Sequence, residues 1–147
     1  MVGLSGLGHV AIRARDLDRV LDFYTGALGL AEMFRLHTDE GALMLVYVRL
    51  TDEQYLEFFP NGVGDSAPPR EAVGLNHLCL TVEDLDATVA ELTERGVALA
   101  RPVITGKDGN RQAWIADPEG NRIELMEMSP SSQQAEAIAR LKGRPSG

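Results

Sequence analysis

The sequence predicts an α+β protein made of two tandem βαβββ modules and a short C-terminal helix, and three observations support this fold class. "GLGHVAIRARDLD" at residues 6–18 returns as "GLNHLCLTVEDLD" at residues 74–86, with six identical positions at an offset of 68. Each copy begins as an apolar strand, and the apolar residues that follow it have the spacing of a helix. Each half then ends in three further strand-like segments. Because only two copies exist, the repeat indicates a duplication rather than a solenoid.

Size and composition set the class of protein. A chain of this length can bury about 70% of its unfolded surface, so we expect residues 1–147 to form a single domain. The net charge of -8 argues against nucleic-acid and acidic-membrane partners, since both require a basic face. One cysteine excludes an internal disulfide framework and fits a reducing, cytoplasmic location. Neither a signal peptide nor a bilayer-spanning apolar stretch is visible.

The first module, about residues 6–60, is predicted to run from a strand through a helix to three strands. Asp16 can cap the helix because a carboxylate accepts from the open N–H groups of the first turn, and Gly29 suits a left-handed helix end. The apolar residues between them follow helical spacing: Leu17, Val20, Leu21, Tyr24 and Leu28. The expected strands are 9–13, 31–37, 42–50 and 54–59.

The second module, about residues 74–128, follows a linker over about residues 60–73 that is rich in Gly and Pro. Asp84 and Gly96 are the expected ends of its helix. The expected strands are 77–82, 98–102, 111–116 and 121–128. A module of roughly 60 residues is marginal alone, so a core shared by two modules gives the duplication a physical reason.

Two local patterns complete the chain. "DPEGN" at residues 117–121 predicts a turn, because Pro suits the second turn position and Gly tolerates positive φ. The C-terminal helix is expected over about residues 131–142, with Ser131 and Gln134 as a capping box.

The duplicated histidines lie on a distinct face of their strands. Since side chains alternate across a strand, His9 and Arg13 share one face while Val10 and Ile12 take the other. The second copy repeats this alternation around His77. The aliphatic face suits packing against the helices. The opposite face, which bears the histidines, must then line a groove or cavity.

The last strand of each module repeats as well. "YLEFF" at 55–59 and "RIELM" at 122–126 match at an offset of 67 and place Glu57 and Glu124 at equivalent positions, opposite their apolar neighbours. A lone strand histidine is usually structural, and a lone glutamate usually lies on a solvated face. Four such groups that recur in register instead favour a divalent-metal site. Four ligands of octahedral type leave two positions open, which is typical of catalysis.

Two other side chains share the histidine face. Arg13 requires an anion there, and a structural salt bridge and an anion-binding role remain equal alternatives. Cys79, two residues after His77, is expected to be a small buried hydrophobe.

Two βαβββ halves with paired His and Glu residues resemble the vicinal oxygen chelate superfamily, and within it bacterial glyoxalase I (lactoylglutathione lyase). The resemblance covers residues 6–128 and is carried by "GHVAIRARDLDRVLDFYTGALGL", "YLEFFPN", "GLNHLCLTVEDLD" and "DPEGNRIEL". It implies a glyoxalase-like fold, in which the modules form a cupped mixed sheet. It also implies a homodimer, with the site within one chain or shared between two.

The resemblance further implies the site residues. The metal ligands fall on His9, Glu57, His77 and Glu124, and a histidine as first ligand is similar to the bacterial class that uses nickel or cobalt, with zinc as an alternative. Arg13 and Asn61 match positions that contact glutathione in that family.

The implied function is that of a lactoylglutathione lyase, acting on the hemithioacetal of a 2-oxoaldehyde and a thiol. Either Glu57 or Glu124 would move the proton, through a metal-bound enediolate. Epimerisation of an acyl-CoA such as methylmalonyl-CoA is an alternative, although that family usually has Gln where this chain has Glu57. Dioxygenases of the superfamily are a further alternative. They generally use two His and one carboxylate, and a fourth protein ligand would occupy a position that their reaction requires open. A drug-binding protein of the bleomycin-resistance kind is the alternative of another class, and such proteins typically lack the four ligands.

Overall fold

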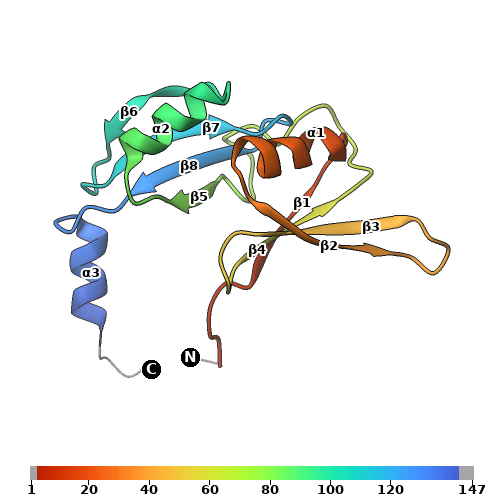
Figure 1. Cartoon of the computed structure of the whole chain (residues 1–147). Coiled ribbons are helices and arrows are strands. Elements are labelled where there is room, and N and C mark those ends of the chain that lie inside the picture. The colour runs from red at the N-terminus through yellow and green to blue at the C-terminus, as the bar shows by residue number, and fades with distance from the viewer. Residues whose placement is uncertain (1–2, 143–147) are drawn as a thin grey trace. The chain divides into compact units, whose positions relative to one another are not determined.

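The computed structural model describes residues 3–142, so residues 1–2 and 143–147 of the predicted domain lie outside the described residues (Figure 1). The chain divides into two compact units. The first unit comprises Leu4–Ala67 together with Asp117–Gly120. The second comprises Pro68–Ala116 with the described parts of Met1–Gly3 and Asn121–Gly147. No helix within residues 3–142 combines the length and the apolarity needed to cross a bilayer.

Each unit holds one module, and the modules have the same order of elements. The first contains β1 (His9–Arg13), α1 (Leu17–Leu21), the π-helical segment η1 (Asp22–Ala27), β2 (Ala31–His37), β3 (Leu43–Arg49) and β4 (Tyr55–Phe59). The second contains β5 (Leu78–Thr81), α2 (Leu85–Glu94), β6 (Arg101–Thr105), β7 (Arg111–Ala116) and β8 (Arg122–Glu127), and the separate helix α3 (Gln133–Leu141) follows it. The predicted α+β class with two βαβββ modules is therefore confirmed.

Each module forms a four-stranded mixed sheet with the same topology. The strand orders are β1-β4-β3-β2 and β5-β8-β7-β6. The first strand of each module pairs in parallel with the last, and the other pairs are antiparallel. This pairing brings the duplicated histidine strand beside the duplicated glutamate strand in both halves.

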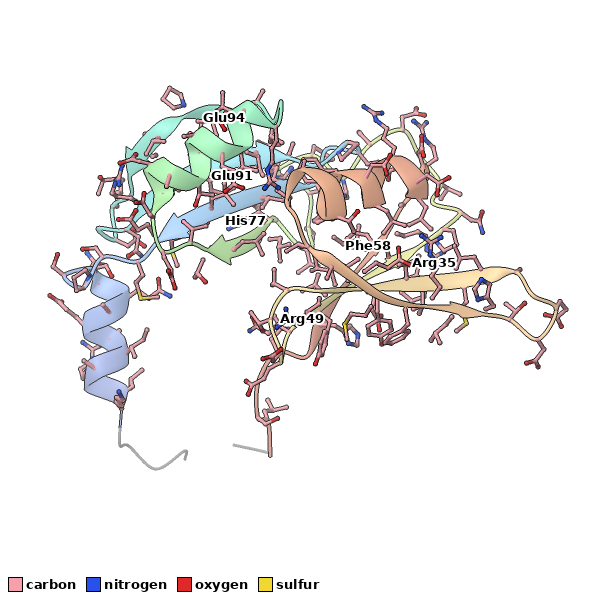
Figure 2. The ribbon with its side chains drawn as sticks, viewed as in Figure 1. Arg35, Arg49, Phe58, His77, Glu91 and Glu94 are labelled. Atoms are coloured by element: carbon pink, nitrogen blue, oxygen red, sulfur yellow. The ribbon has the colours of Figure 1, made fainter. Side chains whose placement is uncertain are left out.

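The core of the first unit lies between its sheet and its helix. Leu56 and Phe58 of β4 are buried on the helix side, where Phe58 lies beneath α1 (Figure 2). The ring centroids of Phe58 and Tyr24 are 4.7 Å apart, and Tyr24 is fully buried. In the second unit Ile123 and Leu125 of β8 occupy the equivalent places. The predicted aliphatic faces thus form the two cores.

The helix ends follow the local sequence. The Asp16 and Asp84 carboxylates accept from the backbone N–H groups three residues later, at 3.1 and 2.9 Å. Gly29 and Gly96 adopt φ of 71° and 80°, the left-handed region that glycine enters without a Cβ clash. Both predicted caps and both predicted stops are confirmed.

The turn after β7 belongs to the first unit rather than to its own module. One carboxylate oxygen of Glu119 accepts from the backbone N–H groups of Arg15 and Asp16, each at 2.7 Å. The Tyr24 hydroxyl donates to Asp117 Oδ2 at 3.3 Å. "DPEGN" is therefore a turn, as predicted, and it also satisfies open N–H groups at the start of α1.

The predicted strand 98–102 is wrong in its boundaries, because β6 covers Arg101–Thr105. The β-branched run at 103–105 extends the strand beyond Pro102. Pro102 is tolerated because β6 is an edge strand, and its pairing with β7 is irregular between Arg101 and Ile104.

The predicted capping box of the C-terminal helix is also wrong, by one residue. Ser132 is the N-cap and its hydroxyl accepts from the Ala135 N–H at 3.1 Å. Gln134 instead accepts from the buried Asn110 side chain at 3.0 Å. The Gln134 side chain thus makes a tertiary contact with Asn110 instead of a capping-box contact at the start of the helix.

Candidate metal centre

The first unit brings His9 and Glu57 together on one face of its sheet. Register pairs Ala11 of β1 with Glu57 of β4, so His9 lies two residues earlier on the same side as Glu57. His9 Nε2 lies 3.4 Å from Glu57 Oε2. The His9 side chain is 48% exposed and that of Glu57 only 8%, so the carboxylate is largely desolvated beside an accessible imidazole.

The second unit repeats this pair with His77 and Glu124. Cys79 of β5 pairs with Glu124 of β8, and His77 Nε2 lies 3.0 Å from Glu124 Oε2. The imidazole is 31% exposed and the carboxylate 13%. We call this side of each sheet its histidine face; it bears His9, Tyr47 and Glu57 in the first unit and His77, Trp114 and Glu124 in the second.

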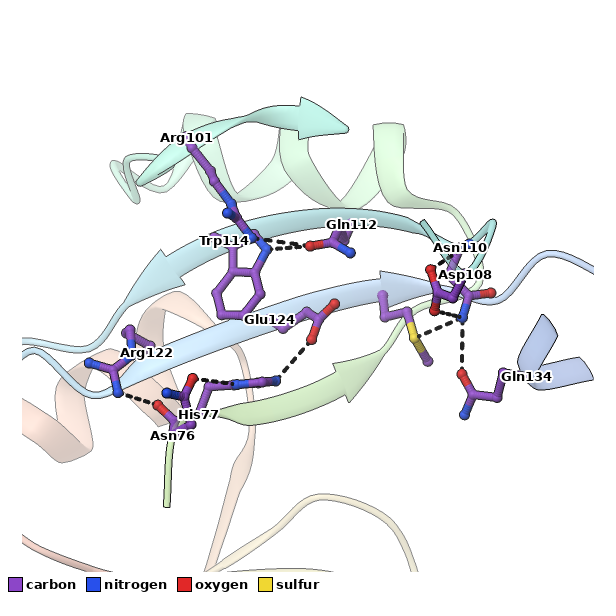
Figure 3. A network of polar contacts seen from close by, with 11 residues as sticks. Asn76, His77, Arg101, Asp108, Asn110, Gln112, Trp114, Arg122, Glu124 and Gln134 are labelled. Atoms are coloured by element: carbon purple, nitrogen blue, oxygen red, sulfur yellow. Dashed lines mark hydrogen bonds and ion pairs between the residues drawn. The ribbon is translucent and has the colours of Figure 1, made fainter. Parts of the chain in front are cut away.

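The chain holds His77 in one orientation through its other ring nitrogen. His77 Nδ1 lies 3.0 Å from the Asn76 side-chain oxygen, which can only accept, so Nδ1 is the donor of this hydrogen bond and Nε2 is the ring nitrogen that faces Glu124. Asn76 is held in turn, since its side-chain amide donates to the Arg70 carbonyl at 2.9 Å. The backbone carbonyl of Asn76 accepts from the Arg122 guanidinium (Figure 3). This is the arrangement that orients a histidine for metal binding.

An aromatic side chain flanks each pair, and neither was among the site residues predicted from the sequence. Tyr47 pairs across the sheet with Glu57, and Trp114 pairs with Glu124. The Trp114 and His77 rings are 4.8 Å apart in an edge geometry, as are Tyr47 and His9 at 6.3 Å. The two aromatic residues are related by the offset of 67 that relates the glutamates, so the repeat itself contained the information that identifies them.

Tyr47 and Cys79 show how the glutamates affect their neighbours. Hydrogen bonding to Glu57 raises the pKa of the Tyr47 phenol above its ordinary value. Partial desolvation, followed by the charge of Glu124, raises the pKa of Cys79 to about 11. The expectation that Cys79 is a buried hydrophobe is wrong, because it is exposed on the histidine face.

The donor atoms of each pair fit a divalent metal ion. An imidazole nitrogen and a carboxylate oxygen converge in each unit, and such N and O donors suit nickel, cobalt and zinc. Within the described residues, neither unit by itself gathers three or more His, Cys, Asp or Glu side chains as a metal-ligand group. Each unit therefore offers two candidate ligands, one imidazole nitrogen and one carboxylate oxygen.

The structure places the two predicted substrate-binding residues near each other. Arg13 is exposed on the histidine face, and its Nη1 donates to the Pro60 carbonyl at 2.8 Å while the guanidinium lies 5.2 Å from the Phe59 ring. Asn61 follows Pro60 with φ of 62° and is exposed. Within the described chain, Arg13 is absent from the ion pairs, so the salt-bridge alternative has no carboxylate there.

Comparison with known families decides the relationship. Residues 6–125 match the model of the Glyoxalase/Bleomycin resistance protein/Dioxygenase superfamily. The chain belongs to this superfamily. The resemblance deduced from the repeated histidines and glutamates is confirmed.

Three relatives show the breadth of this superfamily around the chain. A lactoylglutathione lyase of Pseudomonas aeruginosa is 28% identical over 145 residues, which cover 82% of this chain and 81% of the relative. The uncharacterized protein YwkD of Bacillus subtilis is 31% identical over 127 residues, covering 84% and 98%. The crystal structure of a glyoxalase family protein from Enterococcus faecalis superposes with a TM-score of 0.74 at 28% identity, covering 86% of this chain and all of that one. The glyoxalase-like fold is thereby confirmed.

Proposed function

We propose that this superfamily member is a metal-dependent isomerase of the glyoxalase I type, a lactoylglutathione lyase. The observation that carries the proposal is the double occurrence of one His–Glu pair, on the same face and in the same register of two equivalent sheets. A packing role for these residues does not require that imidazole and carboxylate be kept together twice. Relatives named lactoylglutathione lyase support the choice of reaction.

The four residues His9, Glu57, His77 and Glu124 are proposed to hold one divalent ion, nickel or cobalt, with zinc as an alternative. When bound, the ion supplies Lewis acidity for the negative charge that develops on two neighbouring substrate oxygens. The near-neutral sum of two carboxylates and a divalent cation favours this set in a partly buried site.

The residues of the chain then perform the proton transfer. Glu57 or Glu124 removes the proton from the carbon next to the carbonyl of the hemithioacetal and returns it to the neighbouring carbon. Burial of both carboxylates keeps water away from the proton during transfer. Arg13 and Asn61 are proposed to bind the glutathione part of the substrate, because both are exposed at one end of the histidine face of the first sheet.

Metal analysis followed by an assay tests the proposal. Purified protein is expected to contain one divalent ion per site, and the metal-loaded form is expected to convert methylglyoxal plus glutathione to the thioester product. Stoichiometric metal without isomerase activity would reject this reaction and direct the assay to methylmalonyl-CoA epimerisation. Absence of metal with tight binding of a planar drug would favour sequestration.

A mixing experiment tests whether two chains share the site, as the proposed homodimer allows. The His9→Ala and His77→Ala variants are each expected to be inactive. If one chain supplies the first pair and another the second, mixed dimers regain one intact site and part of the activity. If all four ligands come from one chain, mixing restores nothing.

A further inference from the structure

Arg101 carries an uncompensated charge on the histidine face of the second sheet. It lies on β6 opposite Trp114 of β7, and its guanidinium carbon is 4.4 Å from the centre of the indole ring. Among the ion pairs of the described residues none involves Arg101. Its Nε is buried without a hydrogen-bond partner. A half-buried cation that lacks a carboxylate is unfavourable unless something else supplies the anion.

The guanidinium is nevertheless held firmly in place. Arg101 Nη2 donates to the Gln112 side-chain oxygen at 3.1 Å, and the Trp114 indole N–H donates to the same oxygen at 2.7 Å. Gln112 therefore ties the cation to the ring on which it stacks. A guanidinium fixed in this way loses little side-chain freedom when it binds a planar anion through two hydrogen bonds.

The held cation is close to the proposed site. The centroids of the Trp114 and His77 rings are 4.8 Å apart, and the Arg101 guanidinium carbon is 4.4 Å from the Trp114 centroid. The distance from the guanidinium to the imidazole therefore cannot exceed the sum of these two distances. Figure 3 shows the indole between Arg101 and the His77–Glu124 pair. A ligand that extends past the indole from the His77–Glu124 pair can therefore also reach Arg101.

The first unit shows that packing alone does not require an arginine here. Phe34 occupies the equivalent place, opposite Tyr47, and its ring stacks on Tyr47 with centroids 4.5 Å apart. A neutral side chain thus covers the corresponding aromatic ring in the other half. The charge at position 101 is an addition to that shared packing, and it calls for a separate explanation.

We infer that Arg101, oriented by Trp114 and Gln112, binds a carboxylate of the substrate. The inference deepens the proposed function, since it requires the substrate to carry a carboxylate beyond the two reacting carbons. That carboxylate belongs either to the thiol part or to the aldehyde-derived part of the hemithioacetal.

The single tryptophan of the chain reports on this site directly. Whole metal-free protein is titrated, by Trp114 fluorescence, with glutathione and with glutathione diethyl ester, which has the same thiol but no carboxylate. Glutarate and diethyl glutarate form the second arm, which has no thiol part. If Arg101 binds the carboxylate of an acid, the charge-assisted contact should make that acid bind about ten- to a hundred-fold more tightly than its ester.

Three variants separate charge from packing. Arg101→Phe reproduces the aromatic stack of the first unit without the charge, and it is expected to bring the acid's affinity down to that of the ester. Arg101→Lys keeps the charge without the planar fork and is expected to retain part of the preference. Arg95→Gln removes the same charge from an exposed pair with Glu91 on α2 and is expected to change nothing.

The outcomes decide the inference. If Arg101→Phe loses the acid-over-ester preference only for glutathione, the carboxylate belongs to the thiol part of the substrate. If it loses the preference for glutarate as well, Arg101 forms a site for small carboxylates in general. An unchanged acid-to-ester ratio in Arg101→Phe overturns the inference, even if the variant is less stable, because a packing role alone moves stability and not the ratio. These titrations require neither metal nor turnover. If the wild-type protein has no isomerase activity but Arg101→Phe still loses the acid-over-ester preference, the proposed function is rejected and the carboxylate site is retained.

Discussion

The two units present the same His–Glu pair on the same scaffold but surround it differently. In the first unit, Gly8 precedes the histidine and the flanking ring is Tyr47, whose pKa is raised by its interaction with the glutamate. In the second, Asn76 precedes the histidine and holds its Nδ1, while the flanking ring is Trp114. His9 is correspondingly more exposed than His77.

This difference separates what the fold requires from what each half adds. The core positions, the helix caps and the pairs themselves are common to both halves, because each sheet needs one apolar face and each helix needs its first N–H groups satisfied. The residues around the pairs differ, so they are not needed to form the sheet. They set how each half holds its histidine.

The largest expected effect concerns the glutamates. Glu57→Gln and Glu124→Gln keep the shape of the side chain but remove its basicity, and each is expected to lower kcat by about 10²- to 10⁴-fold. Steady-state isomerase assays with metal content measured in parallel test this. Glu94→Gln, a carboxylate on α2 (Figure 2), is the matched control. Full activity in either variant would show that the corresponding half contributes no proton transfer.

The next effect compares the two cores. Phe58→Ala removes a fully buried ring and is expected to lower the free energy of unfolding by about 3–5 kcal/mol. Leu125→Ala, at the equivalent place of the second unit, removes fewer atoms and is expected to cost about 2–5 kcal/mol. Denaturant unfolding measures both, with the exposed Val63→Ala as control. A larger loss for Leu125 than for Phe58 would reverse the comparison.

A smaller effect tests the hydrogen bond that only the second histidine has. Asn76→Ala frees His77 Nδ1 and is expected to weaken metal binding by about 10- to 100-fold. Gly8→Ala is the matched change in the first unit, and a Cβ there meets no atom within 4 Å, so affinity should stay the same. Metal titration by calorimetry compares the two. Equal effects at both positions would show that the second half holds its histidine no better than the first.

The smallest effect is a pH dependence found in the first unit. Burial, followed by the charge of Asp117, raises the pKa of Tyr24 above that of an unfolded tyrosine. The folded phenol stays neutral when the unfolded one ionises, so this stability is present below pH 10 and declines as pH rises above it. The equivalent residue of the second unit is Leu92, which does not titrate.

Tyr24→Phe is expected to cost about 1 kcal/mol at neutral pH, by removing the hydrogen bond to Asp117. Its free energy of unfolding should then fall less than that of the wild type between pH 10 and pH 11, by about 1 kcal/mol. Chemical denaturation at pH 8, 10 and 11 measures the difference. Parallel decline in both proteins would exclude Tyr24 as the titrating group.

Much of the fold followed from local patterns. The strand 9–13, the caps Asp16 and Asp84 and the glycine stops depend on residues within a few positions of each other, so the sequence alone predicts them. The span of β6 did not follow, because it depends on how an edge strand pairs with β7 around Pro102. The role of Gln134 in α3 did not follow either, because its side chain accepts from Asn110, which is 24 residues away in the sequence.

The candidate site divides in the same way. The repeat by itself determined which histidines and glutamates correspond and which strand face they occupy, because alternation along a strand is a property of the backbone. Only the tertiary structure decided that each histidine lies against the glutamate of its own module. It also decided that Asn76 contacts His77 and is itself held by Arg122, and that Arg101 stacks on Trp114. These contacts join strands far apart in the chain, and strand pairing and register are set by the packing of the whole sheet rather than by any local segment.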